Sequence, residues 1–400
     1  MDETVGAEER FVGGYGGRLL VTVSIGWATI QCGRLVLSPL LPTVRESLAI
    51  SNTEAGLVFS LLWGLYALLQ YPSGRLSDRL SRKTLLVAGG AVGAVGYLLM
   101  GLAPAYLAFL GGAAVVGVGV GLYPTAARAL LSDLFVERRG QAFGLHTASG
   151  DVGGVAAAGL ATLVVAVATW RAAYVPVVVV LALVVVGIHL QSRERYVVER
   201  TELAVRATAR RLLARPGLRR LLVAYVLFAF SWQATTAFLP TFLRASKGLS
   251  PAIANAGFAA LFLVGAVAKP TAGWLGDRVE KRRVAPAALL LGAAALASVL
   301  LVGSTPAIVL GVVLFAAGLL SFPPVMQAYL MDRLPDESMG GDLGAMRSVY
   351  ISVGAAGPTV TGAIADASSF GVAFTALAGC LLASAVLVRS STRQADADED

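Results

Sequence analysis

The sequence predicts an all-α polytopic membrane protein with twelve transmembrane helices, arranged as two six-helix bundles related by pseudo-two-fold symmetry. Three observations predict this fold: the composition, the number of long apolar stretches, and a repeat of about half the chain length. Of the 400 residues, 56% are hydrophobic and 14% are charged, whereas a soluble domain has about 25% charged residues. The composition excludes a soluble globular protein and a disordered chain, and two cysteines exclude a disulfide scaffold.

Long apolar stretches give the number of helices. A bilayer core of about 30 Å requires roughly 20 apolar residues in each helix. The stretches are unbroken runs, such as Val175 to Ile188, rather than the alternating segments of a membrane barrel. Only helices of this kind satisfy their backbone groups within lipid. Twelve stretches occur, near residues 19–43, 53–73, 84–103, 105–131, 140–165, 168–190, 219–243, 251–274, 284–303, 306–330, 342–364 and 370–389.

The basic residues predict the orientation of these helices, because Lys and Arg favour cytoplasmic loops. With the N-terminus inside, 24 of the 32 Lys and Arg residues fall in cytoplasmic tails and loops, four in outer loops and four within apolar spans. We therefore expect a multi-pass protein of the cell (plasma) membrane with both termini in the cytoplasm. The net charge of +8 then has a topological cause, so a nucleic-acid partner is not expected. No cleavable signal peptide is evident, because the first apolar span is too long for one.

A repeat divides the chain into two halves. Leu41-Pro42-Thr43 recurs as Leu239-Pro240-Thr241, and Asp133 recurs as Asp332 at a shift of 199. A parallel duplication of a six-helix unit explains these repeats. The intervening segment is rich in arginine, which solvation and topology explain better than a binding partner. The expected parts are an N-terminal bundle (1–190), a basic cytoplasmic linker (191–218), a C-terminal bundle (219–390) and an acidic cytoplasmic tail (391–400).

One repeated motif carries a family resemblance. Gly74-Arg75-Leu76-Ser77-Asp78-Arg79-Leu80-Ser81-Arg82-Lys83 closely resembles the loop 2–3 signature of the major facilitator superfamily, apart from Ser81 where the family usually has glycine. The stretch from Gly273 to Arg283 resembles its counterpart between helices 8 and 9. The resemblance implies that these loops lock the two halves in the outward-facing state; the alternative is that their charges only enforce topology. The implied gating residues are Gly74, Asp78, Arg79, Arg82, Asp133, Gly273, Asp277 and Arg278.

The same resemblance implies specific contacts for these gate residues. Asp78 would face the N-terminal end of the eleventh helix, where the helix dipole favours an anion. Arg79 and Arg82 would pair with acids such as Asp133. In the fifth span, the stretch from Ser149 to Gly154 is similar to the family's glycine-rich segment but lacks the proline of the antiporter signature.

Ionisable residues inside membrane spans are costly, so they are the first candidates for function. Arg34 lies about 15 residues into the first span, roughly 23 Å along the helix. Its surroundings resemble helix 1 of facilitators for organic anions, where an arginine meets the substrate; an ion pair with Asp151 is the alternative. For Arg347, substrate contact and snorkelling are equally expected. For Arg128 and Lys269, snorkelling or gate pairing is preferred.

A proton-coupling group is also expected within the spans. Asp151 is the only acid well inside a span, and a desolvated carboxylate can bind a proton. Pairing with a cation is an equal alternative for Asp151. His146, one turn earlier, either relays protons or is a packed polar residue. If the family arrangement holds, further polar and aromatic residues line a central cavity: Gln31, Tyr66, Gln70, Tyr123, Trp232, Gln233 and Gln327.

These observations favour a transporter that moves a small organic anion by proton symport, through rocking of the two halves about a midplane site. One alternative is an exporter (proton antiporter) of hydrophobic or cationic compounds, and another is a non-transporting membrane sensor on the same fold. No catalytic cluster, metal site or cofactor is evident, so an enzyme is not expected. The expected partners are a small-molecule substrate, the lipid bilayer and protons, with the monomer as the functional unit.

Overall fold

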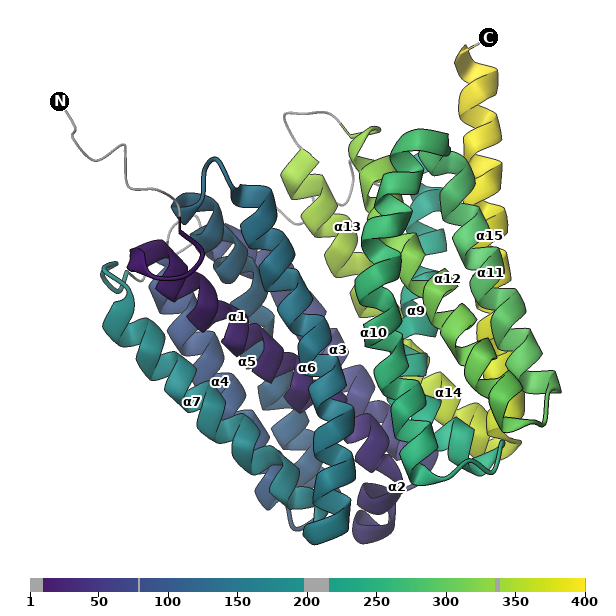
Figure 1. Cartoon of the computed structure of the whole chain (residues 1–400), viewed down its shortest axis with the longest axis horizontal. Helices are drawn as coiled ribbons and strands as arrows, with labels where there is room; N and C mark the ends of the chain where they lie inside the picture. Colours follow the sequence, from purple (N-terminus) through teal and green to yellow (C-terminus); the bar gives the residue numbers. More distant parts are fainter. Residues whose placement is uncertain (1–9, 78–79, 198–215, 335–338, 400) are drawn as a thin grey trace.

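The computed structural model describes residues 10–77, 80–197, 216–334 and 339–399, and over these ranges the regular structure is entirely helical. Figure 1 shows two bundles side by side, one formed by α1–α7 and the other by α9–α15. The first bundle consists of α1 (Gly14–Leu35), α2 (Leu37–Leu48), α3 (Asn52–Ser77), α4 (Arg82–Leu102), α5 (Tyr106–Leu134), α6 (Arg139–Val167), the 3₁₀ turn η1 (Trp170–Ala173) and α7 (Tyr174–Gln191).

The second bundle has a matching set of helices. It consists of α9 (Pro216–Ala245), α10 (Pro251–Leu275), the π turn η2 (Gly276–Glu280), α11 (Lys281–Leu301), α12 (Thr305–Met331), α13 (Met339–Gly354), α14 (Ala356–Ala367) and α15 (Phe370–Glu399). Most of the expected linker, 191–218, lies outside the described residues.

The number of membrane crossings agrees with the sequence. Eleven continuous helical stretches in the described residues are long and apolar enough to cross a membrane. One of them, Pro251–Leu301, is 51 residues long and contains α10 and α11, which run in opposite directions (Figure 1). That stretch therefore supplies two crossings, which gives the twelve transmembrane helices expected for this fold.

Two crossings are broken near their middle. The first changes direction at Val36, between α1 and α2, and the eleventh breaks at Ala355, between α13 and α14. Pro39 explains the first break, because its ring cannot donate to the carbonyl of Leu35 and crowds the preceding turn. Val36 itself keeps helical backbone angles (φ −63°, ψ −25°), so the helix bends without ending. The expected spans 19–43 and 342–364 are each two helical segments.

Glycines allow α5 to pack closely against two neighbours. A Cβ at Gly117 would lie 2.8 Å from the carbonyl oxygen of Leu62 in α3, and one at Gly119 would lie 2.3 Å from the backbone nitrogen of Gly93 in α4. The run of small residues in this span is therefore a helix-packing motif, since small residues let helix backbones approach closely within lipid.

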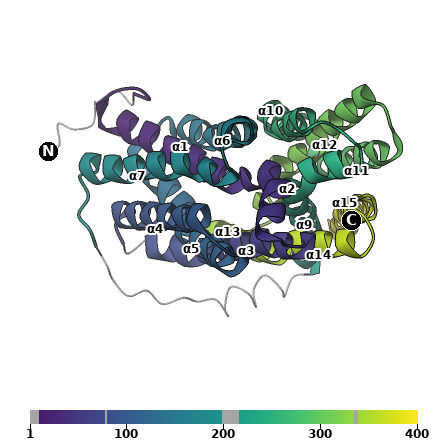
Figure 2. The same cartoon turned by 90° about the horizontal axis from the view of Figure 1, so that it is seen from below.

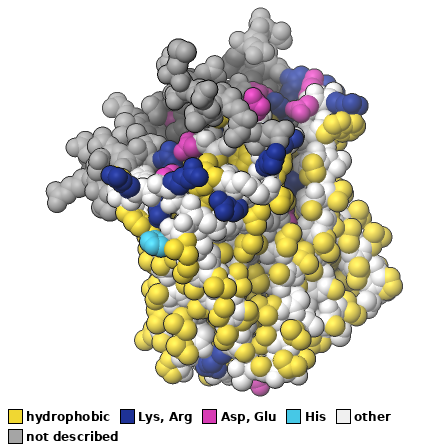
Figure 3. All heavy atoms as spheres, turned by 60° about the vertical axis from the view of Figure 1, so that its left-hand side comes forward, with side chains coloured by type: hydrophobic (Ala, Val, Ile, Leu, Met, Phe, Trp, Pro, Cys, Tyr) yellow, Lys and Arg dark blue, Asp and Glu magenta, His cyan; other side chains and the backbone are white. Residues whose placement is uncertain are grey.

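The start of α1 and the end of α15 lie at the same end of the molecule, which we call the terminal face; the other end is the opposite face (Figure 1). The view in Figure 2, along the bundles, shows the two sets of helices side by side with α2 and α3 reaching toward α9 and α14. Most of the Lys and Arg side chains visible in Figure 3 gather near the terminal face, above a broad hydrophobic surface. An apolar belt of this kind is the surface that lipid covers in a membrane protein.

Equivalent contacts in the two halves reflect the pseudo-two-fold symmetry. Arg82 Nε lies 3.3 Å from Asp133 Oδ2, and Lys281 Nζ lies 2.7 Å from Asp332 Oδ2. Each residue of the second pair lies 199 positions after its counterpart in the first. Ser38 Oγ donates to the carbonyl of Ala237, also 199 positions away, at 2.9 Å. The duplication seen in the sequence is therefore also present in the contacts.

Candidate substrate site and gates

Arg34 is buried at the interface between α1 and α3. Its side chain is almost completely enclosed, with the residue only 4% exposed. The guanidinium lies over two aromatic rings, 3.9 Å from the centroid of Trp63 and 4.6 Å from that of Tyr66. These rings are three residues apart on α3 and so share one face of the helix. Nε and Nη1 of Arg34 are buried without a hydrogen-bond partner, so two donors remain available for an acceptor.

Two further arginines lie within electrostatic reach of Tyr66. Arg128 lies six residues before the end of α5, roughly 9 Å along the helix, and Arg347 lies on α13 in the other bundle; both are half-buried. The charges of Arg34, Arg128 and Arg347 all act on the Tyr66 hydroxyl, and Arg347 contacts it directly. We call these three residues the arginine cluster. None of them forms an ion pair with a carboxylate in the described part of the chain.

Two tyrosines of the second bundle support Arg347. The rings of Tyr225 on α9 and Tyr350 on α13 stack with centroids 4.0 Å apart and an interplanar angle of 27°. Tyr350 is one turn after Arg347 and lies within electrostatic reach of both Arg347 and Tyr66. The arginine cluster is therefore bounded by aromatic rings from both halves: Trp63 and Tyr66 from the first, and Tyr225 and Tyr350 from the second.

Asp151 forms an ion pair across the two halves. Lys269 Nζ on α10 lies 2.6 Å from Oδ1 and 2.8 Å from Oδ2 of Asp151 on α6. The two side chains are 31% and 16% exposed, respectively. Of the alternatives left open by the sequence, pairing of Asp151 with a cation is observed, but the cation is Lys269. An ion pair between Arg34 and Asp151 is therefore wrong, and Lys269 pairs instead of snorkelling to the surface.

His146 lies away from this ion pair. It is 3% exposed, its Nδ1 lies 3.4 Å from Ser24 Oγ, and its ring lies 6.1 Å from that of Trp27. These contacts hold the His146 side chain, which projects from α6, against α1. They describe a packed polar residue, and a role in proton relay stays a prediction.

Three of the expected cavity residues use their polar groups in helix packing. The Tyr123 hydroxyl donates to the carbonyl of Val23 at 3.1 Å. Gln70 Nε2 donates to Gly121, at 3.4 Å, and Gln233 Nε2 donates to Ile351 at 3.0 Å. We therefore leave Tyr123, Gln70 and Gln233 out of the proposed substrate site.

The remaining expected cavity residues have different surroundings. Gln31 is half-buried on α1, and its Oε1 has no hydrogen-bond partner. Trp232 on α9 packs edge-to-face on Phe262 of α10, with centroids 6.3 Å apart. Gln327 on α12 is exposed. Gln31 is one turn before Arg34 and stays within the proposed site, while Trp232 and Gln327 stay predictions.

At the opposite face, a carboxylate of the second half caps a helix of the first. Asp366, near the end of α14, accepts hydrogen bonds from both the backbone and the side chain of Asn52 (3.1 and 2.7 Å) and of Thr53 (2.8 and 2.7 Å). Two turns away, Thr359 Oγ1 and Ser60 Oγ lie 2.7 Å apart. A carboxylate at a helix N-terminus is favoured by the helix dipole and by the free N–H groups there. We call the Asp366 contacts the outer latch.

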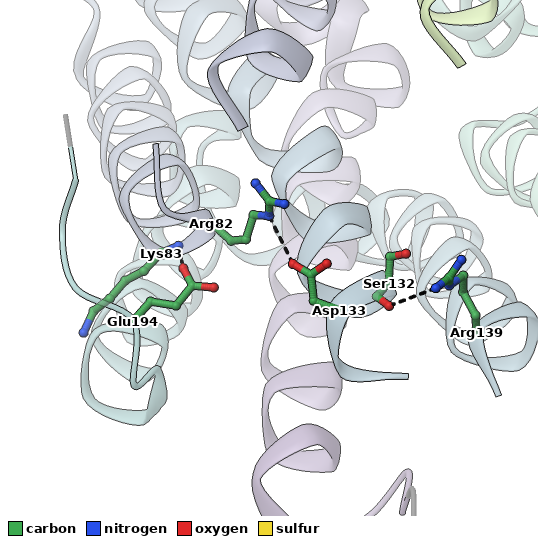
Figure 4. A network of polar contacts seen from close by, with 6 residues as sticks. All are labelled: Arg82, Lys83, Ser132, Asp133, Arg139 and Glu194. Atoms are coloured by element: carbon green, nitrogen blue, oxygen red, sulfur yellow. Dashed lines mark hydrogen bonds and ion pairs between the residues drawn. The ribbon is translucent and has the colours of Figure 1, made fainter. Parts of the chain in front are cut away.

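At the terminal face, polar contacts join three helices of the first half with the segment after α7. Arg82 pairs with Asp133, as the family resemblance implied, and Arg139 donates to the carbonyl of Ser132 at 3.4 Å (Figure 4). The backbone N–H of Lys83 donates to Glu194 Oε2 at 2.9 Å. These contacts lie within one half and stiffen its terminal edge.

The other expected gate residues are only partly described. Asp78 and Arg79 lie outside the described residues, and Gly74 is part of the α3 backbone. Gly273 lies in α10, and Asp277 and Arg278 lie in the π turn η2. The Arg278 guanidinium lies over the Trp274 ring at 4.2 Å. Gating by these residues stays a prediction.

Sequence reasoning identified one of the four aromatic residues of the site, Tyr66, and missed the other three. Trp63 and Tyr350 were not among the expected residues, although each is three positions from a residue that was, Tyr66 and Arg347. The spacing of one helical turn could have identified them. Tyr225 lies in an apolar stretch with no such signal. Arg128 was expected to snorkel or to pair at a gate, but it lies within reach of the Tyr66 and Arg347 side chains.

Twelve crossings in two bundles related by pseudo-two-fold symmetry are the architecture of transporters that work by alternating access. The family model described as Major Facilitator Superfamily matches residues 23–268 and 221–398. The chain belongs to the major facilitator superfamily, and it is a multi-pass membrane protein that transports a small molecule.

Relatives with curated names carry different solutes. A probable sulfoacetate transporter of Cupriavidus necator is 28% identical over 270 residues, and the alignment spans 62% of this chain and 62% of the relative's length. A glycerol-3-phosphate transporter of Bacillus subtilis is 24% identical over 92% of this chain and 90% of the relative. In fold, the chain is similar to a bacterial homolog of the human lysosomal transporter Spinster in an inward-facing and occupied conformation. The TM-score is 0.82, with 17% identity over 97% of this chain and 98% of the other.

Proposed function

We propose that this protein carries a small organic anion across the plasma membrane, in symport with protons. The observation that carries the proposal is the burial of Arg34 between two aromatic rings with two donors unpaired. An uncompensated buried charge is strongly unfavourable, so an anionic ligand would stabilise it. A guanidinium presents its N–H groups in a fork that matches carboxylate, sulfonate or phosphate oxygens.

The arginine cluster also supports an anion over the alternative of a cationic or hydrophobic substrate. A cation entering this site would meet the positive charges of Arg34, Arg128 and Arg347, and like charges at close range repel each other strongly in a low-dielectric medium. The two relatives named above carry a sulfonate and a phosphate ester, which agrees with this choice.

For proton coupling, we propose the Asp151–Lys269 ion pair. Protonation of Asp151 removes its charge and so weakens its bond to Lys269, which belongs to the other half. Because α6 and α10 move apart when the halves rock, the strength of this pair would control that motion. Proton binding and opening would then be linked, as symport requires.

The outer latch supports an assignment of the conformational state. We propose that the terminal face is cytoplasmic, that both termini lie inside, and that the structure is closed toward the outside. The four hydrogen bonds of Asp366 and the Thr359–Ser60 contact join the halves at the opposite face. We propose the monomer as the working unit, surrounded by lipid.

The proposal is tested by uptake into proteoliposomes that contain the purified protein. The panel consists of organic anions (sulfoacetate, glycerol 3-phosphate, an aldonate), a lipophilic cation and a neutral polyol, each with and without an inward proton gradient. We expect uptake of at least one anion, stimulated by the gradient. Uptake of the cation or the polyol alone would overturn the anion proposal, and no transport of any solute would favour the sensor.

Asp151→Asn tests the coupling step. With the carboxylate replaced, we expect the protein to lose proton-driven accumulation of the anion while exchange of internal for external anion continues, because exchange needs no net proton movement. The double variant Asp151→Asn with Lys269→Gln is the control for leaving Lys269 unpaired. Accumulation that persists in both variants would exclude Asp151 as the coupling group.

A further inference from the structure

The arginine cluster includes one arginine from the second half. This arrangement indicates how many negative charges the substrate carries, in addition to the sign of its charge. Arg34 and Arg128 belong to the first bundle, whereas Arg347 belongs to α13 of the second. Arg34 and Arg347 both contact Tyr66, whose side chain is 2% exposed. Tyr66 therefore adjoins two guanidinium groups that come from opposite halves.

Each of these two guanidinium groups has its own aromatic support. Arg34 rests on Trp63 and Tyr66. Arg347 lies beside Tyr350, which is stacked on Tyr225 at 4.0 Å. Aromatic faces hold the Arg34 guanidinium in place through cation–π contact, and Arg347 lies within electrostatic reach of Tyr350 and Tyr225, so the two groups occupy separate positions.

Both positions keep unused donors. Nε of Arg347 is buried without a hydrogen-bond partner, as are Nε and Nη1 of Arg34, and Ser348 and Ser352 on α13 bury unpartnered hydroxyls. One negative charge can neutralise one guanidinium, which would leave the other buried and unpaired. A ligand that satisfies both needs two negative charges.

We propose that the substrate is a short dianion whose two anionic groups bind in two subsites on either side of Tyr66, one at Arg34 and the other at Arg347. This inference rests on the proposed function and narrows it to a chemical class. Because the subsites belong to different halves, a dianion would draw α1 and α13 together, whereas a monoanion would engage only one half. Arg347 is then the residue that selects doubly charged substrates.

The test uses pairs of compounds that differ only at one end. Sulfoacetate is compared with isethionate, and malonate with 3-hydroxypropionate, so that a carboxylate is replaced by a hydroxymethyl group. Dissociation constants are measured on the purified full-length protein by ligand-induced thermal stabilisation at fixed ionic strength. We expect the wild type to bind the dianion of at least one pair about tenfold more tightly than its monoanion, since hydrogen bonds to charged groups contribute this much.

Variants separate the roles of the two arginines. In Arg347→Gln, we expect the two members of the preferred pair to bind with equal affinity, because the second anionic group has lost its partner. In Arg34→Gln, both members should lose binding. Arg347→Lys keeps the charge and should retain part of the preference for the dianion. This variant is the control for folding of the site.

The following results would contradict the two-subsite proposal. If monoanions bind the wild type as tightly as dianions, or if Arg347→Gln weakens both members equally, the two-subsite proposal is wrong while anion transport through Arg34 stands. If no compound of either pair binds, the dianion proposal is also wrong. If, in addition, the uptake panel yields no anion, the proposed function fails with it.

Discussion

At the scale of single residues, Gly119 and Gly111 lie on the same helix, α5, in different surroundings. A Cβ on Gly119 would lie 2.3 Å from the backbone nitrogen of Gly93, whereas a Cβ on Gly111 would meet nothing within 4 Å. A backbone atom cannot rotate away as a side chain can, so α4 and α5 would have to move apart. The close approach of this helix pair therefore requires glycine at position 119.

Gly119→Ala should consequently destabilise the protein by about 1–3 kcal/mol, the usual range for an overpacked core. Gly111→Ala is the matched control and should leave stability unchanged or slightly raised, because alanine is a better helix former than glycine. The measurement is the midpoint of thermal unfolding of both variants in the same detergent. Equal midpoints for the two variants would show that the contact with Gly93 is not a tight one.

Arg34 and Arg347 could be identified from the sequence, because a charged residue within an apolar stretch is recognisable whichever way its side chain points. Tyr225 could not, because an aromatic residue in a membrane span is common and its function depends on the rotation of its helix. Trp63 and Tyr350 could be found only through their spacing of one helical turn from Tyr66 and Arg347. Tyr123 is the opposite case. It was expected to line the cavity, but its hydroxyl donates a hydrogen bond to the carbonyl of Val23 within the first bundle.

At the scale of helices, the outer latch joins α14 of one half to the N-terminus of α3 in the other. Asp366 makes all four of its hydrogen bonds across this boundary. These bonds must break before the halves can separate at the opposite face. Glu54, in the same region, bonds only within its own half, to the backbone N–H and hydroxyl of Ser51 at 2.8 and 3.0 Å.

Asp366→Ala should therefore shift the protein toward states that are open at the opposite face. The assay is disulfide formation between cysteines placed at Ser60 and Thr359, after replacement of Cys32 and Cys380 by serine. We expect the cross-linking rate to fall by roughly twofold or more in Asp366→Ala, because charge-assisted bonds that favour the closed state are lost. Glu54→Gln should cross-link like the parent. An unchanged rate in Asp366→Ala would mean that other contacts hold this face closed.

At the scale of the whole molecule, the internal repeat organises the structure. The sequence predicted twelve helices and a shift of 199, and the pairs Arg82–Asp133 and Lys281–Asp332 obey that shift. These features were predictable because hydropathy and duplication are properties of the chain itself. The pairing of Asp151 with Lys269 was not, because the sequence does not say which helices of the two halves meet. Contacts between halves, where the proposed coupling lies, are the part that only the structure supplies.

The central claim is that Arg34 binds the anion, and counterflow of a radiolabelled anion in proteoliposomes tests it most directly. Arg171→Gln is the matched control, because Arg171 also lies over a tryptophan, Trp170 at 4.3 Å, but donates to Ser47 and Ala103 outside the proposed site. With the anion found by the uptake panel at low concentration, we predict counterflow in Arg34→Gln about tenfold or more below wild type. Arg171→Gln should match the wild type. Wild-type counterflow in a folded Arg34→Gln protein would contradict the account.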